Sequence, residues 1–513
     1  MSKQLTKTVS LMLSLCFLLT MLGCSSESTN KSDEVTVTMP KTSEPDKGFD
    51  PIYGWGCGEH VHEPLIQSTL VKTNSSMEIE NDLATSYAIS DDAKTITFQI
   101  RNDAKFTDGT KLTADDVAFT INKELENIDN PADFSSINNA VAIDDTTCEV
   151  HLNKPDNTVL YLLATVGIVP ANSYNSDTYG RNPIGSGRYK LDSWEQGTSA
   201  TFVANENYYG NSPSIKRVKV LFVDEEASYS CAKTGEADVV YASPLLSQNE
   251  VNNYDLLQVE TVDSRGISLP TAKNNVTQEF NVRYAINLAV DKQKLIDGCL
   301  YGCGKIANSV CDNLPWACKS MQIETNASKA AMILDEAGWK TSEDGIRQKD
   351  GVKCEFNLYY ASSDSTRQAL AYAFASQMKE VGIQVNTIGA SWDDIYPHQY
   401  TDAVLWGWGS NSPSELISVI KSNGTCNFAQ FSSVEADSLI DEAVSETNIS
   451  DSYTKLSEAQ SYVSPEKASS WVWLANVDHT YFVKKGLKVA DQKIHPHGHG
   501  WSLINNVDEW SWE

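Results

Sequence analysis

Histidines and one cysteine form the group of side chains best suited to metal binding. His495, His497 and His499 alternate near the C-terminus, and an extended segment would place all three imidazoles on one face. Cys57 and His60 lie close together near the N-terminus. Imidazole and thiolate suit nickel, copper or zinc. The pattern therefore predicts a transition-metal site built from these five residues, with the metal as cargo and no resident cofactor.

Two other interpretations of these histidines stay open. The run His495-Pro496-His497-Gly498-His499 is also typical of a solvated loop. A metal could instead be bound inside a chelate that aromatic rings and arginine side chains hold.

Tryptophans beside glycines are the second candidate group. Trp55 stands in a glycine-rich loop, and Trp406 and Trp408 flank Gly407. Glycine lets the backbone approach a ligand closely while an indole stacks on it. For each tryptophan the alternative is a place in the hydrophobic core. The expected ligand-binding residues are Tyr53, Trp55, Trp406, Trp408 and Asn411.

The sequence lacks the signatures of common enzymes. It contains no Gly-x-Ser-x-Gly motif, no phosphate-binding glycine loop and no His-Glu-x-x-His motif. We therefore expect that the protein is not an enzyme and has no catalytic residues.

The first residues are typical of an export signal. Lys3 and Lys7 precede an apolar run over 11–22, which is too short to span a bilayer. The run ends at Leu22-Gly23-Cys24, which is similar to a site of lipid attachment. We expect a signal peptide over 1–23 and a lipidated, flexible tether over 24–33 that anchors the protein to the outside of the cell membrane. An ordinary signal peptide with an incidental Cys24 is the alternative.

Eleven cysteines leave their pairing undecided. Cys16 lies in the expected signal peptide and Cys24 at its end, so an odd number remains in the folded part. Disulfides, buried free thiols and a metal site all stay open. The run from Cys299 through Cys303 and Cys311 to Cys318 lacks the tight Cys-x2-Cys pair of structural zinc sites.

Charge excludes some partners. The chain of 513 residues has a formal net charge of -28, which argues against binding nucleic acid or anionic lipid headgroups. Hydrophobic residues make up 41%, enough for sizeable cores, and the length suggests two to four domains.

Helices and strands alternate along the folded part. We expect strands at 34–39, 95–101 and 217–223 and helices at 60–70, 113–124 and 327–337. Thr113 is the expected N-cap of its helix. This alternation indicates an α/β or α+β class.

One stretch resembles a known family. Residues 90–101 read Ser-Asp-Asp-Ala-Lys-Thr-Ile-Thr-Phe-Gln-Ile-Arg, and 103–117 continue through Phe106-Thr107-Asp108-Gly109 to Leu112-Thr113-Ala114-Asp115-Asp116-Val117. This resembles the signature of the family-5 extracellular solute-binding proteins, the peptide and nickel group. Further landmarks follow in the family's order: His62-Glu63-Pro64-Leu65, Pro183 to Tyr189, Asn205 to Gly210, Val282 to Asp291 and Ala330 to Trp339.

The resemblance implies a fold and a function. The fold is an α/β, two-lobed periplasmic-binding-protein clamp of type II, in the large peptide-binding cluster. Residues 34–268 and 480–513 would form lobe I, with an extra subdomain at 66–185, and 269–479 would form lobe II. A monomer would enclose a small-molecule or peptide ligand between the lobes and deliver it to the permease and ATPase subunits of an ABC importer. The alternative is a sensor that presents its solute to a membrane receptor.

The resemblance also bears on the ligand. Peptide-binding relatives place an aspartate, which pairs with the peptide's ammonium, in the segment that corresponds to 405–413. This chain has no aspartate there. A buried ammonium without a carboxylate is costly. The segment is closer to the form of nickel and metallophore binders, so an oligopeptide and a nickel or other metal chelate both stay open.

Overall fold

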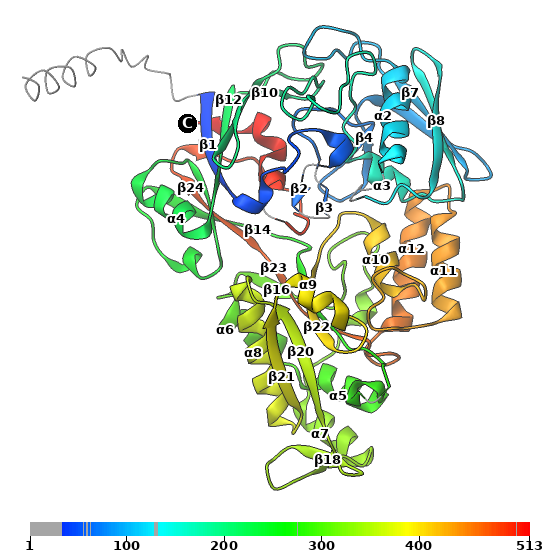
Figure 1. Cartoon of the computed structure of the whole chain (residues 1–513), viewed down its shortest axis with the longest axis vertical. Helices are drawn as coiled ribbons and strands as arrows, with labels where there is room; N and C mark the ends of the chain where they lie inside the picture. Colours follow the sequence, from blue (N-terminus) through cyan, green and yellow to red (C-terminus); the bar gives the residue numbers. More distant parts are fainter. Residues whose placement is uncertain are drawn as a thin grey trace, which may run out of the picture.

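The computed structural model describes residues 33–54, 56–57, 60–61, 63–127, 132–273, 275–498 and 500–513, and of 56–57 and 60–61 the backbone alone. Figure 1 shows two lobes, with helices and strands mixed in both. The expected signal peptide and Cys24 lie outside the described residues. No helix within the described ranges is both long and apolar enough to cross a bilayer.

A seven-stranded mixed sheet forms the centre of the first lobe. Its middle strand β1 lies parallel to β12 and β13, and the other pairs are antiparallel. The alternating Val35, Val37 and Met39 of β1 are all buried in the core of this sheet. In order, the strands are β10 (Tyr189–Glu195), β11 (Ser199–Ala204), β12 (Arg217–Val223), β1 (Glu34–Pro40), β13 (Val239–Ala242), β24 (His479–Lys484) and β14 (Tyr254–Val259), and α4 (Glu225–Thr234) packs beside them.

A four-stranded antiparallel sheet with α2 (Ala114–Glu126) forms a separate unit beside that sheet (Figure 1). Phe98 of this sheet and Val117 of the helix are buried in one core. The strands lie in the order β6 (Ala84–Ile89), β7 (Thr95–Ile100), β9 (Thr147–Leu152) and β8 (Ile137–Asp144), and α3 (Val159–Leu163) and the pair β4 (Val71–Thr73) and β5 (Ile79–Asn81) lie next to it.

A six-stranded mixed sheet forms the second lobe. Helices cover one of its faces, and Leu405, Val472 and Leu474 pack into the core beneath them. The strands lie in the order β16 (Gly304–Ile306), β23 (Trp471–Val477), β15 (Ser264–Ser268), β22 (Ala403–Trp408), β20 (Glu355–Ala361) and β21 (Gln384–Ala390). The helices of this lobe are α5 (Phe280–Ala289), α6 (Lys292–Cys299), α7 (Ala327–Glu336), α8 (Ser365–Glu380), α9 (Trp392–Ile395), α10 (Pro413–Ile420), α11 (Val434–Val444) and α12 (Ile449–Gln460).

Short strand pairs and a small three-stranded sheet complete the fold. They are β2 (Gly56–Cys57) with β3 (His60–Val61), β17 (Lys340–Thr341) with β18 (Arg347–Lys349) and β19 (Val352–Lys353), and β25 (Leu487–Lys488) with β26 (Ser511–Trp512).

The chain passes twice between the two large sheets. It leaves β14 at Val259 and enters β15 at Ser264, and it returns from β23 at Val477 to β24 at His479. The chain therefore passes from the first sheet to the second a few residues before the boundary expected at residue 268. These two short connections are the places where a clamp of this form can bend.

The expected helix at 60–70 is wrong. Residues 60–61 form β3, and the described residues 63–70 form turns. Gly187 donates its N–H to the Ile66 carbonyl at 2.7 Å, and an added Cβ on Gly187 would stand 2.6 Å from that carbonyl oxygen. A distant glycine turn therefore takes the backbone acceptor that a helix would need. The other strands and helices named from the sequence are confirmed.

Candidate ligand-binding site

One edge of the six-stranded sheet collects polar side chains. Strands β20 and β22 are parallel, so their carboxyl ends lie at the same edge. Helix α8 follows β20 and α10 follows β22, each capped by a side chain: Asp364 accepts from the Arg367 N–H, and Ser412 from the Ser414 N–H. In sheets with parallel strands, ligands bind outside the carboxyl ends.

Two arginines meet at this edge over a glycine. A Cβ added at Gly407 would lie 2.3 Å from Arg367 Nη2 and 3.0 Å from both Arg265 Nη1 and His497 Cε1. A side chain at position 407 would force these groups to move. The Nε of each guanidinium is buried and has no hydrogen-bond partner among the described residues. Each arginine therefore has one buried N–H donor that no described residue accepts.

Two carboxylates balance the two guanidinium charges. Asp263 forms a doubly hydrogen-bonded pair with Arg265, in which Nη2 donates to Oδ2 at 3.2 Å. Arg367 Nη1 donates to Asp364 Oδ2 at 2.6 Å. His497 Nδ1 lies against the same Asp263 carboxylate. The cluster is buried and close to neutral, and its remaining hydrogen-bonding capacity is mainly that of a donor.

Burial and charge set the pKa values here. Burial alone would raise the pKa of Asp263, but Arg265 and His497 bring it well below its usual range. Burial lowers the pKa of His497, against the opposing effect of Asp263. Burial, and then the neighbouring Arg265, lower the pKa of Arg367. Carboxylates and guanidinium groups are therefore ionised at neutral pH, and the imidazole of His497 is neutral.

The other face of the sheet carries the tryptophans. Ser264, Gly266 and Ser268 alternate along β15 and leave room for indoles: a Cβ on Gly266 would lie 2.5 Å from the Trp473 ring. Trp406 donates its indole N–H to Ser268 Oγ at 3.0 Å and stacks on Phe428 with ring centroids 4.3 Å apart. Trp406 and Trp408 are only 5% and 6% exposed and belong to one buried cluster. Both therefore have a packing role, and their role as a ligand wall stays a prediction.

Trp408 also lies in a row of buried polar groups. It faces Ser264 across β22 and β15, and Ser264 faces Asn476 across β15 and β23. Trp408 Nε1, Ser264 Oγ and both amide atoms of Asn476 have no hydrogen-bond partner among the described residues, and neither does Asn411 Oδ1. Buried polar groups of this kind normally pair with water or ligand. The row therefore offers uncharged donors and acceptors on the face of the sheet opposite the arginine pair.

The remaining predicted site residues do not come together in what the structure describes. His495 faces His479, Nδ1 to Nδ1 at 3.2 Å, and its Nε2 lies 3.1 Å from Gln492 Oε1, whereas His497 contacts Asp263. Tyr53 is half-buried, with Lys47 Nζ 4.6 Å above its ring. Trp55, the side chains of Cys57 and His60, and His499 lie outside the described residues. Among the rest, no three His, Cys, Asp or Glu side chains are placed to hold a metal ion.

The residues that sequence reasoning missed are Asp263, Arg265, Asp364 and Arg367. The two Asp–Arg pairs lie a hundred residues apart in sequence and meet only through the sheet order. One local signal existed: Asp364 and Arg367 have the spacing of a helix N-cap with a cation in the first turn, where a cation is unfavourable without a special reason.

Seven of the described cysteines are free thiols. Cys148, Cys231, Cys299, Cys303, Cys311, Cys318 and Cys354 form no disulfide, and most are buried. Burial raises the pKa of both Cys148 and Cys354 to about 12. Such thiols are inert at neutral pH.

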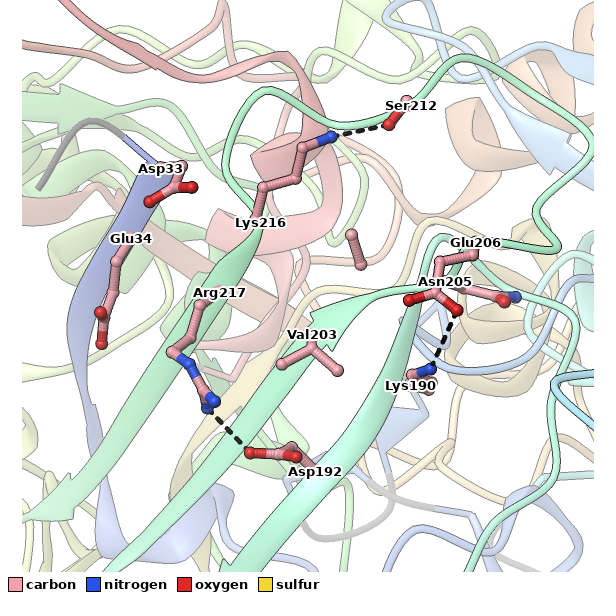
Figure 2. Close-up of a pocket in the computed structure, with 11 residues that line it drawn as sticks. Asp33, Glu34, Lys190, Asp192, Val203, Asn205, Glu206, Ser212, Lys216 and Arg217 are labelled. Carbon is pink, nitrogen blue, oxygen red and sulfur yellow. Dashed lines mark hydrogen bonds and ion pairs between the residues drawn. The ribbon is translucent and has the colours of Figure 1, made fainter. Parts of the chain in front are cut away.

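A pocket of about 790 Å³ lies elsewhere, on the outer strands β10–β12 near the first described residue (Figure 2). Its cations are already paired: Arg217 with Asp192 at 2.8 Å, and Lys190 with Glu206 at 3.6 Å. Lys216 Nζ donates to Ser212 Oγ at 2.7 Å. Partly exposed ion pairs share the pocket with Lys216 and with the carboxylates of Asp33 and Glu34.

Known proteins resemble the chain over most of its length. It is 29% identical to Protein XP55 of Streptomyces lividans over 79% of this chain and 77% of that one. It is 26% identical to the oligopeptide-binding protein AppA of Bacillus subtilis over 89% and 92%. The structure of NikZ from Campylobacter jejuni, solved with Ni(L-His), superposes with a TM-score of 0.76 and 25% identity, over 94% of this chain and 99% of that one.

A family model agrees with these similarities. The model of bacterial extracellular solute-binding proteins, family 5, matches residues 78–428. That range holds the signature around α2, the four-stranded sheet and most of the second lobe, including Arg265, Arg367 and Gly407. The chain therefore belongs to the family-5 extracellular solute-binding proteins of ABC importers, which bind solutes and are not enzymes.

Proposed function

We propose that this protein captures a carboxylate-bearing solute, either an oligopeptide or a nickel or other metal chelate, and delivers it to an ABC permease. The observation that carries the proposal is the meeting of Arg265 and Arg367 over Gly407, at the carboxyl end of β22. Guanidinium groups with open N–H donors are suited to carboxylates. An oligopeptide, the ligand named for AppA, and Ni(L-His), the ligand bound to NikZ, both contain carboxylates.

The proposed ligand lies at the sheet edge between the lobes. Lobe I takes residues 34–263 with 479–513 and lobe II takes 264–477, so that β15 stays with the sheet of the second lobe, and the lobes bend at the connections near Asp263 and Asp478. The carboxylate of the ligand lies at the arginine pair, and aromatic rings shield the ligand from water. Closure of the lobes strengthens each of these polar contacts, because it lowers the local dielectric.

The metal, where present, arrives within the chelate in this proposal. A direct site from Cys57, His60, His495, His497 and His499 is the second mode of metal binding, supported by the sequence pattern alone. The tether ending in a lipidated Cys24 holds the protein at the outer side of the cell membrane, and a monomer is sufficient for the capture step.

The ligand can be identified directly. Protein purified without denaturation is analysed by native mass spectrometry and elemental analysis, and then titrated calorimetrically with oligopeptides and with Ni²⁺ plus L-histidine. We expect one class to bind and to raise the melting temperature with ligand concentration. If neither class binds and nothing with a carboxylate co-purifies, the proposed ligand chemistry is wrong.

Arg367→Gln tests the carboxylate contact. Because a buried charged hydrogen bond is lost, affinity should fall by at least about thirtyfold, which corresponds to about 2 kcal/mol. The matched control is Arg217→Gln, which removes an arginine from the pocket of Figure 2. Equal affinity in both variants would contradict a ligand carboxylate at Arg367.

A further inference from the structure

A contact remote from both chain connections joins the four-stranded unit to the end of α11. Asn157 Nδ2 donates to the Ala443 carbonyl at 2.9 Å and to the Glu446 carbonyl at 3.0 Å. The Asn157 backbone N–H donates to the Val444 carbonyl at 2.9 Å. The last carbonyls of a helix have no partner inside that helix. One buried asparagine therefore caps a helix nearly 300 residues away in the sequence.

The loop that carries Asn157 is fixed in advance. Asp156 Oδ1 accepts from the Thr158 N–H at 3.1 Å and from the Thr158 hydroxyl at 2.6 Å. Its other oxygen accepts from the Ser136 hydroxyl, next to the start of β8. These hydrogen bonds already order the loop, so the loop loses little conformational entropy when Asn157 contacts α11.

A pair of tyrosines makes a second contact of the same kind. The Tyr161 hydroxyl donates to the Met77 carbonyl at 3.0 Å and meets the Tyr453 hydroxyl of α12. Because the Tyr161 proton is committed to Met77, Tyr453 is the donor between the two hydroxyls. The buried Trp316 packs edge-on against Tyr161, with ring centroids 5.4 Å apart, and lies 5.7 Å from Tyr453.

The apolar packing is continuous across this contact. Ile79 of β5 and Ile449 of α12 each pack against both the core of the four-stranded unit and the tryptophan cluster of the second lobe. In Figure 1, α3 lies directly above α11 and α12, on the side away from β14 and β24. Opening the two lobes about the connections at 260–263 and Asp478 would separate these surfaces.

We propose that Asn157 and Tyr453 are positioning residues of a clasp, formed by Asn157, Tyr161, Tyr453 and the end of α11, that holds the cleft closed without touching the ligand. The clasp gives the ligand-free protein a closed population, and it brings lobe I against the β22 edge before a solute arrives. Apparent affinity scales with the fraction of protein in the competent form. The inference rests on the two-lobed fold and not on the ligand class, so it can be tested without a ligand.

Asn157→Ala in ligand-free protein is the first test, read by hydrogen–deuterium exchange. Losing the side-chain cap should lower the closed-to-open ratio roughly tenfold. Exchange should then accelerate by that factor at 443–446 and also at 408–412, a segment that Asn157 does not touch. The matched control is Asn153→Ala, whose amide bonds only Ser135 and Ile137 of the same unit. It should leave 408–412 unchanged.

Tyr453→Phe is the second test, because it removes one hydroxyl and keeps the ring. X-ray scattering should show a larger radius of gyration for this variant than for Tyr462→Phe, its control in the turn after α12. The proposed clasp is contradicted if hydrogen–deuterium exchange in Asn157→Ala and Tyr453→Phe accelerates only at 157–161 and 443–446. It is equally overturned if ligand-free wild type already scatters as an open form and 443–446 exchange without protection.

Discussion

At the scale of single residues, Gly407 decides what the sheet edge can hold. Because it has no side chain, Arg265, Arg367 and His497 can all approach the same backbone position. The sequence drew attention to this glycine for the tryptophans on either side. The structure gives it a second use, since the strand places Trp406 and Trp408 on one face and the arginines on the other. Sequence reasoning found the position but not the charges, which come from segments far apart in the chain.

His497 gives this cluster a pH dependence. Burial lowers its pKa in the folded protein, so an unfolded chain takes up the proton first as pH falls. Stability is therefore unaffected by this group above about pH 6.5 and decreases as pH falls below that value. The neighbouring groups are Asp263, Arg265 and Arg367, all of which stay charged in this range.

The measurement is urea unfolding of wild type and His497→Gln between pH 5.5 and 7.5. We expect wild type to lose stability relative to the variant as pH falls across this range. His151→Gln, which replaces a half-buried histidine of the four-stranded sheet, serves as the control for removing a histidine outside this cluster. A difference that grows in favour of wild type at low pH would show that His497 is protonated in the folded cluster.

At the scale of elements, the family signature has a mechanical explanation. Thr113 and Asp116 form a capping box at the start of α2, in which the Thr113 N–H donates to Asp116 Oδ2 at 2.8 Å. Asp116 Oδ1 also accepts from the Ala171 N–H at 2.9 Å, so the cap ties the helix to a distant loop. The N-cap was predictable because its residues are adjacent in sequence. The tie to Ala171 was not, because nothing local marks it.

Thr113→Ala should destabilise the protein by about 1 kcal/mol, the usual cost of losing an N-cap side chain. Thr110→Ala, which removes only a hydroxyl bonded to Asp108 in an exposed turn, should cost much less. Urea unfolding of both variants at pH 7 makes the comparison. Equal midpoints would mean that Asp116 alone holds the start of α2.

At the scale of the whole molecule, the sequence predicted the two-lobed fold through its resemblance to a family, and most strands and helices through their periodicity. It could not predict which surfaces of the lobes meet. Asn157 and Tyr453 are ordinary polar residues in the sequence, and only the packing of α11 and α12 against the four-stranded unit gives them a common role. Contacts between distant elements produce no periodic pattern in the sequence from which they could be predicted.

Anchoring also belongs to this scale. We expect Cys24→Ser to abolish lipid attachment and to leave the protein either released or unprocessed, because the Cys24 thiol is the group that we expect to be acylated. Membrane fractionation and mass spectrometry of the N-terminus report the outcome. Cys16→Ser, within the expected signal peptide, should have no such effect. Unmodified Cys24 in an intact mature N-terminus of wild type would rule the anchor out.

The buried thiols can report how often each layer of the molecule opens. Cys148 lies in the core of the four-stranded sheet, Cys231 on α4 beside the seven-stranded sheet, and Cys354 in the core of the six-stranded sheet. None of the three is tied up in a disulfide. A buried thiol reacts with an alkylating reagent only after its surroundings open. The modification rate of each thiol therefore reports how often one layer opens. Three rates from one unlabelled protein would therefore rank the layers by how often each opens.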